Sequence, residues 1–409
     1  MALRFLTIDD FNVDGSTVFL RVDVNSPIDP SSSTILDDSR IKATKETLDS
    51  LREAKVVLGS HQSRPGKEDF TTLEEHADIL GRYCSQEVIF VEDVMGPTAR
   101  NMIKQLKRGQ ILVLDNLRTC SEEVLEASPQ KLAKTMFIRR LAPLCDLYVN
   151  DAFAAAHRAQ ASLVGFAYVI PAAAGKLMEK ELKALNAVLW ETEHPCTYAL
   201  GGAKVEDKLP VVENILKSGK ADTVLVGGLM AKVFLKAMGF ELTKGDDEEL
   251  TGLIEFVQRA RAILDKYSER IKVPTDLATL RSKKRVEAPA KNLDYEEPSL
   301  DIGIDTCKEY AQIIMKSKTV VANGPMGVFE KEGFDLGTKT ILNAIASCKG
   351  ITVIGGGHLA GLASILGIEE KFTHISTAGG AMLSMLAGEN LPGIDALVQS
   401  AEKYNKQGP

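Results

Sequence analysis

The chain has 409 residues, of which 44% are hydrophobic and 26% are charged, and its formal net charge is -7 at pH 7. This length is too great for one ordinary hydrophobic core and predicts two domains of about 150 to 200 residues each. The composition excludes an intrinsically disordered chain, and the net negative charge argues against a general affinity for nucleic acids or acidic membranes.

The N-terminal segment MALRFLTIDDFNVDG has no apolar core flanked by a cleavage site. The longest nearly apolar run, residues 163–175, contains Pro171 and is shorter than the roughly 18 residues that cross a bilayer. The six cysteines are scattered without a C-x-x-C pair, which predicts neither a zinc site nor a disulfide framework. We therefore expect a cytoplasmic protein without a membrane partner.

In the first half of the chain, short β-rich runs alternate with longer stretches of helical periodicity. The predicted strands cover residues 17–24, 54–60, 87–92, 110–115 and 145–150. Strands that are apolar at nearly every position are typical of parallel sheets with helices on both faces. The first half is therefore predicted to be a doubly wound α/β domain.

The segment GKLMEKELKALNAVLW, residues 175–190, predicts a helix between the two halves. Its Leu and Val residues recur at helical spacing with Lys and Glu between them, and Pro171 and Gly175 precede it. We interpret this segment as an interdomain helix.

The second half repeats the alternation of strands and helices, with strands predicted at residues 196–200, 222–228, 318–324, 350–356 and 373–376. Residues 244–298 are more charged and include RSKKR at 281–285. We interpret this charged region as a solvated surface and assign it no function.

The predicted fold class is α/β, with two doubly wound, Rossmann-like parallel-sheet domains, an interdomain helix and a cleft between the domains. The predicted boundaries are 1–172 for the N-terminal domain, 173–190 for the interdomain helix, 191–390 for the C-terminal domain and 391–409 for a segment that packs back on the N-terminal domain.

Cationic side chains follow several predicted strands of the first half, where open parallel sheets bind their ligands. These cations are Arg40, His61, Arg64, Arg118 and Arg158, and Asp23 and Asn25 follow the first strand. Guanidinium groups match phosphate and carboxylate in a bidentate geometry. A converging cluster therefore predicts a site for a small, multiply charged anion such as a phosphorylated acid.

Glycines follow the predicted strands of the second half. They occur in GGAKVEDK at 201–208, at 227–228, in NGPMGVFE at 323–330, in GGGH at 355–358 and in STAGGA at 376–381. Such turns let the backbone approach a phosphate and direct N–H groups toward it from a helix N-terminus. The pattern favours a nucleotide site, although no P-loop motif occurs.

Eight stretches occur in this order along the chain: RVDVN, DDSRIKAT, SHQSRPG, YVNDAFAAAHRAQAS, GGAKVEDK, NGPMGVFE, HISTAGGA and LPGIDAL. Together they resemble the signature stretches of the phosphoglycerate kinase family over nearly the whole chain. The resemblance implies reversible phosphoryl transfer between ATP and the carboxylate of 3-phosphoglycerate, giving 1,3-bisphosphoglycerate and ADP, in a hinged enzyme that is a monomer or a homodimer. It also implies Mg²⁺ bound with the nucleotide and no nucleic acid partner.

The resemblance also implies roles for individual residues. The 3-phosphoglycerate site would comprise Asp23, Asn25, Arg40, His61, Arg64, Arg118 and Arg158. The nucleotide site would comprise Gly201, Lys204, Lys208, Asn323, Glu330, Gly355, Gly356, Gly357 and His358. The transferring phosphoryl group would be stabilised by Arg40, Lys204, Gly379 and Gly380, and no residue is assigned as a direct metal ligand.

Three residues depart from the family pattern. Ser63 and Asp115 stand where the family usually has Gly and Glu, and we expect both changes to be tolerated. His358 stands where the family usually has an aspartate beside the metal-bound phosphates. The arrangement of Mg²⁺ at this position is therefore left open.

Two other functions remain compatible with parts of the sequence. GGGHLA at 355–360 fits the G-x-G-x-x-A pattern of a nicotinamide-dependent dehydrogenase, but no acidic residue ends the next predicted strand. A nucleotide-binding protein without catalytic activity is the second alternative. Such a protein would need neither Arg40 nor Lys204 at the ligand of the other domain.

Overall fold

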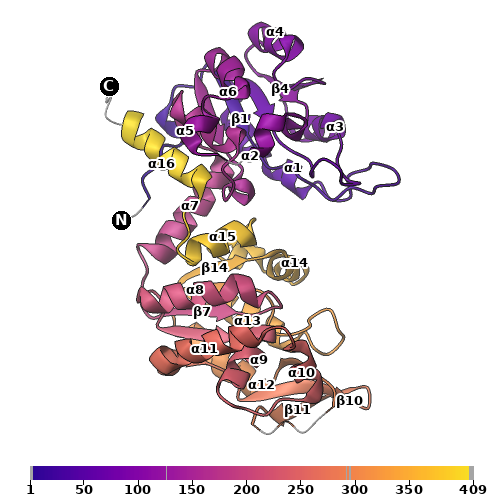
Figure 1. Ribbon diagram of the computed structural model, residues 1–409, viewed down its shortest axis with the longest axis vertical. Helices are drawn as coiled ribbons and strands as arrows, with labels where there is room; N and C mark the ends of the chain where they lie inside the picture. Colours follow the sequence, from indigo (N-terminus) through magenta and orange to yellow (C-terminus); the bar gives the residue numbers. More distant parts are fainter. Residues whose placement is uncertain (1–2, 126, 292, 294–295, 405–409) are drawn as a thin grey trace. The chain divides into compact units, whose positions relative to one another are not determined.

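The computed structural model describes residues 3–125, 127–291, 293 and 296–404 (Figure 1). They form two compact units. Leu3–Lys183 and the segment that starts at Asn390 form the N-terminal unit, and Ala184–Glu389 form the C-terminal unit. Each unit has its own six-stranded sheet, so the predicted α/β fold with two domains is confirmed.

The N-terminal sheet has the strand order β3-β4-β2-β1-β5-β6, and its neighbouring strands are parallel. Its strands are β1 (Thr17–Arg21), β2 (Lys55–Gly59), β3 (Glu87–Val91), β4 (Gln110–Leu114), β5 (Leu147–Asn150) and β6 (Ala172–Ala174). The five strands predicted in this half are confirmed. The short strand β6 was not predicted.

Helices cover both faces of this sheet. They are α1 (Ser39–Ala43), α2 (Lys45–Ser50), α3 (Glu74–Tyr83), α4 (Pro97–Gln105), α5 (Pro129–Leu132), α6 (Met136–Leu141) and α16 (Pro392–Tyr404). On one face Phe19 stacks on Phe166 with ring centroids 4.2 Å apart, whereas Val18 and Leu20 belong to the core on the other face. Helix α16 packs beside β6, where Ser400 Oγ accepts a 2.9 Å hydrogen bond from the backbone N–H of Ala172.

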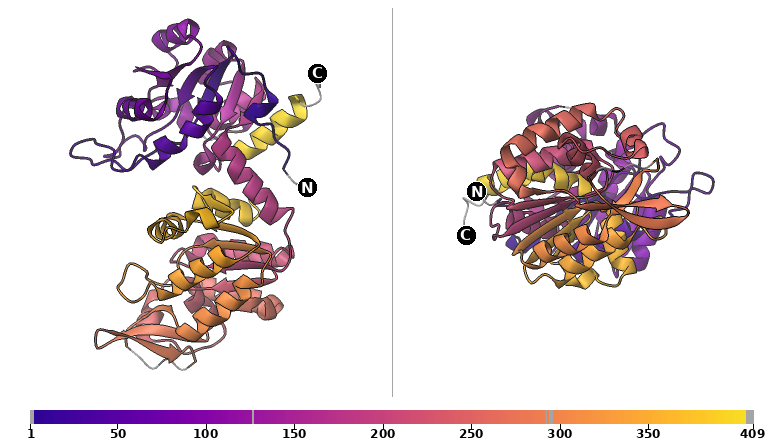
Figure 2. Two further views of the ribbon diagram at one scale, coloured as in Figure 1. Left: turned by 180° about the vertical axis from the view of Figure 1, so that it is seen from behind. Right: turned by 90° about the horizontal axis from the view of Figure 1, so that it is seen from below.

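The C-terminal sheet is also parallel, in the order β15-β14-β13-β7-β8-β9. Its strands are β7 (Cys196–Leu200), β8 (Thr223–Val226), β9 (Ile271–Lys272), β13 (Thr319–Asn323), β14 (Ile351–Gly355) and β15 (His374–Ser376). The helices are α8 (Val205–Lys217), α9 (Gly228–Ala237), α10 (Lys244–Glu249), α11 (Ile254–Tyr267), α12 (Ile304–Met315), α13 (Leu336–Ser347), α14 (Gly357–Ile365) and α15 (Gly379–Leu386). The right-hand view of Figure 2 shows helices on both faces of this sheet. The five strands predicted here are confirmed, and β9 was not predicted.

A small antiparallel sheet occupies part of the region that the sequence analysis interpreted as a solvated surface. It consists of β10 (Asp276–Arg281), β11 (Lys284–Pro289) and β12 (Ser299–Ile302), in the order β11-β10-β12. The interpretation is wrong for Arg285, the last residue of RSKKR. Its Nη1 lies 2.7 Å from Oδ2 of the fully buried Asp301, because the guanidinium packs inward over the ring of Phe334.

In each sheet, the chain connections run in opposite directions from two neighbouring strands near its centre. In the N-terminal unit the chain leaves β1 toward β2 and leaves β5 toward β6, on the opposite side. In the C-terminal unit the connections after β7 and β13 diverge in the same way. Open α/β sheets bind ligands at the carboxyl ends of such strand pairs. The structure thus offers one ligand crevice in each unit.

The first amides of helix α7 (Lys176–Leu189) donate hydrogen bonds to the buried carboxylate of Asp151. Asp151 Oδ1 accepts hydrogen bonds from the backbone N–H groups of Leu177 at 2.9 Å and Met178 at 3.0 Å, and Oδ2 accepts one from Thr47 Oγ1 at 2.6 Å. A Cβ at Gly175 would lie 2.2 Å from Asp151 Oδ1, so only glycine fits there. Burial raises the pKa of Asp151 to about 6. Asp151 therefore caps the helix that the sequence analysis predicted at 175–190.

All six cysteines lie in the described part of the chain and are free thiols. Helices long and apolar enough to cross a bilayer do not occur among residues 3–125, 127–291, 293 and 296–404.

Replacing Asp151 with Ala removes the acceptor for the first amides of α7. The expected result is a five- to thirtyfold faster hydrogen–deuterium exchange of the Leu177 and Met178 amides, measured by NMR, which corresponds to about 1–2 kcal/mol for a lost helix cap. Asp78→Ala is the control, because Asp78 is exposed on α3. Equal exchange rates in the wild type and in Asp151→Ala would contradict the capping role.

Candidate active site

The carboxyl end of the N-terminal sheet holds a cavity of about 780 Å³ with a cationic wall. Arg64 comes from the loop after β2, Arg118 from the turn after β4, and His157 and Arg158 from the loop after β5. Convergence of parallel strand ends brings these side chains together although they are up to 94 positions apart in the sequence (158 - 64 = 94). Val124 and Leu125 add an apolar part to the lining.

The positive charges of this cavity are packed against one another. Burial, followed by the charges of Arg158 and Arg21, lowers the pKa of Arg118 to about 10. Burial, followed by the charge of Arg64, also lowers the pKa of Arg158. A bound anion would relieve this repulsion, because an opposite charge favours the ionised form of each guanidinium. The cavity is thus suited to a phosphate or carboxylate.

His61 is held as a neutral hydrogen-bond donor beside these arginines. Arg21 is fully buried and its Nη2 lies 3.2 Å from His61 Nδ1. A guanidinium can only donate, so Nδ1 accepts and the ring proton resides on Nε2. Burial, followed by the charges of Arg21 and Arg118, lowers the pKa of His61 well below its usual range. His61 Nε2 therefore carries a proton that it can donate to an anion at neutral pH.

Arg21 was missed by the sequence analysis, which treated the first strand as a structural element. The sequence did contain a signal, because Arg21 is a charged residue in an otherwise apolar predicted strand. A charge that is buried in this way needs a partner. Arg21 Nε donates to Ser162 Oγ at 2.8 Å, and the buried carboxylate of Glu123 accepts hydrogen bonds from the backbone N–H and the hydroxyl of Ser162. This network fixes Arg21 under His61.

Asp23, Asn25 and Arg40 lie beside the same strand end. Arg40 Nη1 is 3.0 Å from Asp23 Oδ2, and the Arg40 side chain is otherwise exposed. Asn25 Oδ1 accepts a 2.7 Å hydrogen bond from the backbone N–H of Ser63. In addition to burial, the positive charge of Arg40 contributes to the lowered pKa of His61. The negative charge of Asp23 partly offsets the lowering of the Arg158 pKa by burial. The structure therefore groups all seven residues expected at an anion site around one crevice.

Two departures from the family pattern fit their surroundings. Ser63 has a φ of 54°, in the left-handed region that favours glycine. Its hydroxyl donates to Asp69, and Arg118 donates to its carbonyl, which hold this conformation. Asp115 accepts hydrogen bonds from the backbone N–H groups of Leu73 and Asn116 at 3.1 and 2.7 Å. Both side chains thus form hydrogen bonds within the loops of this crevice.

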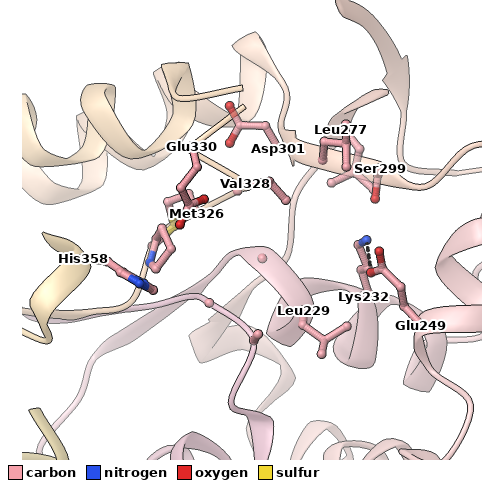
Figure 3. A pocket seen from close by; sticks show the side chains of 16 residues that line it. Leu229, Lys232, Glu249, Leu277, Ser299, Asp301, Met326, Val328, Glu330 and His358 are labelled. Carbon is pink, nitrogen blue, oxygen red and sulfur yellow. Dashed lines mark hydrogen bonds and ion pairs between the residues drawn. The ribbon is translucent and has the colours of Figure 1, made fainter. Parts of the chain in front are cut away.

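A second cavity, of about 450 Å³, lies within the C-terminal unit (Figure 3). Leu229, Leu277, Met326 and Val328 give its lining apolar surface, and Asp301 also lines it. Glu330 and His358 lie toward one end. Lys232, Glu249 and Ser299 lie toward the other end. Apolar side chains in the lining, with polar groups at both ends, suit a ligand with a flat ring and polar extremities.

Glycines bring backbone segments close together along this cavity. The N–H of Gly202 donates to the carbonyl of Pro325 at 2.6 Å, and the N–H of Gly228 donates to that of Met326 at 2.7 Å. A Cβ at Gly201 would lie only 2.1 Å from the Pro325 oxygen. Larger residues would therefore separate the segments after β7 and β13, which line the cavity together.

An unpaired donor is directed at the turn GGGH. Asn323 is buried at the end of β13, and its Nδ2 has no hydrogen-bond partner in the described part of the chain. Nδ2 lies 3.3 to 3.5 Å from the positions that Cβ atoms would occupy at Gly355, Gly356 and Gly379. Gly356 has a φ of 95° and precedes the first turn of α14, and Gly379 opens α15. Asn323 and two helix N-termini thus surround a place for an anion.

Lys204 and Lys208 lie at the start of α8. Lys204 is exposed at the position that caps the helix, whereas Lys208 is only 4% exposed. Burial lowers the pKa of Lys208, and within the described residues its Nζ makes one long hydrogen bond, of 3.4 Å, to the Lys204 carbonyl. A buried ammonium with such weak pairing is suited to an anionic ligand.

His358 is exposed at the start of α14, with its ring centroid 5.4 Å from that of Phe329. The described residues contain no group of three or more His, Cys, Asp or Glu side chains placed to hold a metal ion. Gly357 and Gly380 have open space where a Cβ would lie. These two positions therefore leave room for a ligand beside the backbone.

Comparison with known proteins places the chain in a family. The sequence model for phosphoglycerate kinase matches residues 8–389. A phosphoglycerate kinase of Methanobacterium bryantii is 48% identical over 410 residues, which cover 99% of this chain and 100% of the relative. A phosphoglycerate kinase of Pyrococcus horikoshii is 46% identical over 407 residues, covering 98% of each chain.

Solved structures agree with this placement. The crystal structure of phosphoglycerate kinase from Pyrococcus horikoshii OT3 superposes with a TM-score of 0.86 at 45% identity, covering 97% of this chain and 100% of that one. The structure of phosphoglycerate kinase from Coxiella burnetii gives 0.84 at 30% identity, covering 97% and 99%. These matches argue against both alternative functions, a nicotinamide-dependent dehydrogenase and a nucleotide-binding protein without catalytic activity. The chain belongs to the phosphoglycerate kinase family, whose members are phosphotransferases that act on a carboxyl group.

Proposed function

We propose that this chain transfers the γ-phosphoryl group of MgATP to the carboxylate of 3-phosphoglycerate, giving 1,3-bisphosphoglycerate and ADP, and that it catalyses the reverse reaction. The observation that carries the proposal is that the two units of this chain hold cavities of different chemistry. One unit has a cavity of mutually repelling arginines. The other has a glycine-rich cavity beside Asn323 Nδ2, a buried donor that has no partner in the described part of the chain. The first suits a phosphorylated acid and the second suits a nucleotide.

The reaction requires no general base, because the attacking carboxylate is ionised at neutral pH. The N-terminal crevice has to bind the phosphate of 3-phosphoglycerate and to orient its carboxylate. Arg64, Arg118 and Arg158 suit the phosphate, and His61 Nε2–H donates without adding charge. Asp23 and Asn25 hold Arg40 and the loop of Arg64 in place.

Direct transfer requires the attacking oxygen and the γ-phosphorus to approach to within about 3 to 3.5 Å. Charge then develops on the equatorial oxygens of the phosphoryl group. We assign the stabilisation of these oxygens to Arg40 and Lys204, whose side chains are exposed, and to the N–H groups at Gly379 and Gly380. A Cβ at Gly379 would lie 3.5 Å from Asn323 Nδ2. The remaining phosphates are held by Lys208, by Asn323 and by the glycines at 355–357, which lead from β14 into α14.

Magnesium enters this reaction as part of the substrate MgATP. Mg²⁺ prefers hard oxygen ligands and retains several waters, so the imidazole of His358 is a poor direct ligand. The metal is then held mostly by nucleotide oxygens, and His358 donates a hydrogen bond to a phosphate or to a metal-bound water. Glu330, at the same end of the cavity, accepts hydrogen bonds from the ribose.

A coupled assay tests the proposed function. Consumption of ATP should require both 3-phosphoglycerate and Mg²⁺. Hydrolysis of ATP at the same rate without 3-phosphoglycerate, or no consumption with it, would refute the proposal.

Arg40→Ala should lower kcat by about a hundredfold to a thousandfold, the usual cost of losing one donor that stabilises a transition state. The affinity for MgADP, measured by calorimetry, should not change, because Arg40 belongs to the other unit. Lys208→Ala should give the opposite pattern, a raised KM for ATP. Arg52→Ala is the control, since Arg52 is an exposed arginine paired only loosely with Glu53. An Arg40→Ala enzyme with more than a tenth of the wild-type kcat would remove Arg40 from catalysis.

His61 should remain neutral over the range in which an ordinary histidine titrates. Its ring C–H resonances should stay fixed from pH 7.5 to 5.5, and ¹⁵N shifts should show a protonated Nε2 and an unprotonated Nδ1. The unfolded chain binds this proton near pH 6.5 and the folded chain does not, so the folded state loses stability as the pH falls below about 6.5. Arg21→Met should raise the pKa of His61 toward 6.5. A wild-type titration midpoint near 6.5 would contradict the lowered pKa of His61, and ¹⁵N shifts of a protonated Nδ1 would contradict the assigned tautomer.

His358→Asp should keep kcat within about threefold of the wild type and lower the Mg²⁺ concentration that gives half-maximal activity. The reason is that a carboxylate is a better magnesium ligand than an imidazole. His358→Asn is the matched control, because its amide lacks the charge and should leave the Mg²⁺ dependence unchanged. Complete loss of activity in a folded His358→Asp protein would show that the imidazole is essential.

A further inference from the structure

Gln62 lies in the loop after β2, and the proposed mechanism assigns it no role. Its side chain is fully buried. Oε1 accepts hydrogen bonds from the backbone N–H of Ser26 at 3.0 Å and from His76 Nε2 at 3.1 Å. Nε2 donates to the carbonyl oxygens of Ser26 at 2.9 Å and of Asp69 at 3.2 Å. Both acceptor positions and both protons of this amide are therefore in use.

The backbone of Gln62 is bound to a second loop. Its carbonyl accepts a 2.8 Å hydrogen bond from Asn116 Nδ2, and its N–H donates to Asn116 Oδ1 at 3.3 Å. Asn116 follows β4, and its Oδ1 also accepts a 3.1 Å hydrogen bond from the N–H of Arg118. Ser26 follows Asn25 in the loop after β1. Gln62 thus joins three loops that carry residues of the anion crevice.

His76, on α3, serves this network as a neutral donor. The orientation of the Gln62 amide is fixed by Ser26, because a backbone N–H only donates and a carbonyl only accepts. Gln62 Oε1 therefore faces His76, and the ring proton resides on His76 Nε2. His76 is buried, and burial lowers its pKa to about 4. The donor is thus present at neutral pH.

The loop that contains Gln62 has a backbone conformation that needs support. Ser63 has a φ of 54°, and such a residue keeps this conformation only where surrounding contacts hold it. His61 and Arg64 flank this pair of residues and supply two cations of the anion crevice. A shift of the loop would therefore move both of them relative to Arg118, which is held by Asn116.

We propose that Gln62 is a positioning residue that holds the loop of His61 and Arg64 in its anion-binding conformation before a ligand binds. His76 in turn holds the Gln62 amide. That the ligand is 3-phosphoglycerate rests on the proposed function. In Gln62→Met, the buried N–H and carbonyl of Ser26 lose their partner. The KM for 3-phosphoglycerate should rise about tenfold to a hundredfold, the usual cost of buried polar groups that are left unpaired.

Two variants of His76 test the support of the amide. Leucine removes the donor to Gln62 Oε1, whereas the side-chain amide of glutamine can donate from nearly the same place as the imidazole Nε2. In His76→Leu, the KM for 3-phosphoglycerate should rise about threefold to tenfold, the range for one hydrogen bond. In His76→Gln it should stay within about twofold of the wild type.

The pattern of kinetic changes distinguishes positioning from general destabilisation. In both Gln62→Met and His76→Leu, kcat should stay within about threefold of the wild type and the KM for ATP should not change, since binding of one substrate is affected. Ser400→Ala is the matched control, because it removes another buried hydrogen bond of the same unit, to Ala172. Its KM for 3-phosphoglycerate should equal that of the wild type.

Hydrogen–deuterium exchange of the amides of residues 62 and 63, measured by NMR without substrates, separates this proposal from the proposed function. Faster exchange in Gln62→Met and His76→Leu, but not in His76→Gln or Ser400→Ala, would support the positioning role even if no transfer to 3-phosphoglycerate occurred. Wild-type exchange in His76→Leu, or the same acceleration in Ser400→Ala, would overturn it. Circular dichroism verifies folding, and the two His76 variants decide the question if Gln62→Met does not fold.

Discussion

The two parallel sheets constrain where chemistry can occur in this protein. Both faces of each sheet are covered by helices, so the strand interiors are apolar and carry few polar groups. Ligand-binding side chains are therefore displaced to the loops at the carboxyl ends. The divergent connections at β1 and β5 and at β7 and β13 open one crevice in each unit. The anion cavity and the glycine-rich cavity follow from this single architectural rule.

Within both crevices the electrostatics are incomplete without a ligand. Burial and mutual repulsion lower the pKa of Arg118 and Arg158, and burial lowers that of Lys208. Asn323 Nδ2 is buried and has no hydrogen-bond partner among the residues that the structure describes. Each of these features costs free energy in the empty protein, and an anionic substrate offsets that cost. A bound anion thus gains binding energy by pairing with charged and polar groups that the fold already holds in place.

The sequence allowed the strands and the strand-end residues to be predicted because both leave local signals. Short β-rich runs that are apolar at nearly every position identified ten strands. The seven residues expected around the anion crevice do lie together. The three-alanine strand β6 and the two-residue strand β9 were too short and too weakly β-branched to predict. Their pairing is imposed by the neighbouring strands β5 and β8.

The sequence carries no local signal for the pairing of Lys232 with Glu249 at one end of the C-terminal cavity. Glu249 lies in KGDDEE, which reads as a solvated helix, and only the fold brings it to Lys232, 17 positions away. Arg285 lies in a basic run and is turned inward by a hairpin and by Asp301. Arg21 left a signal, a charge in an apolar strand, but its partner His61 is a long-range contact. Such pairings depend on tertiary structure rather than on local pattern.

Hydrogen–deuterium exchange with each ligand alone tests most directly that one substrate binds to each unit. 3-Phosphoglycerate should slow exchange in residues 60–66 and 157–162 and leave exchange in residues 323–330 and 355–359 unchanged. MgADP should give the reverse pattern. Protection of the same unit by both ligands would contradict the assignment of the arginine crevice to the phosphorylated acid and of the glycine-rich crevice to the nucleotide.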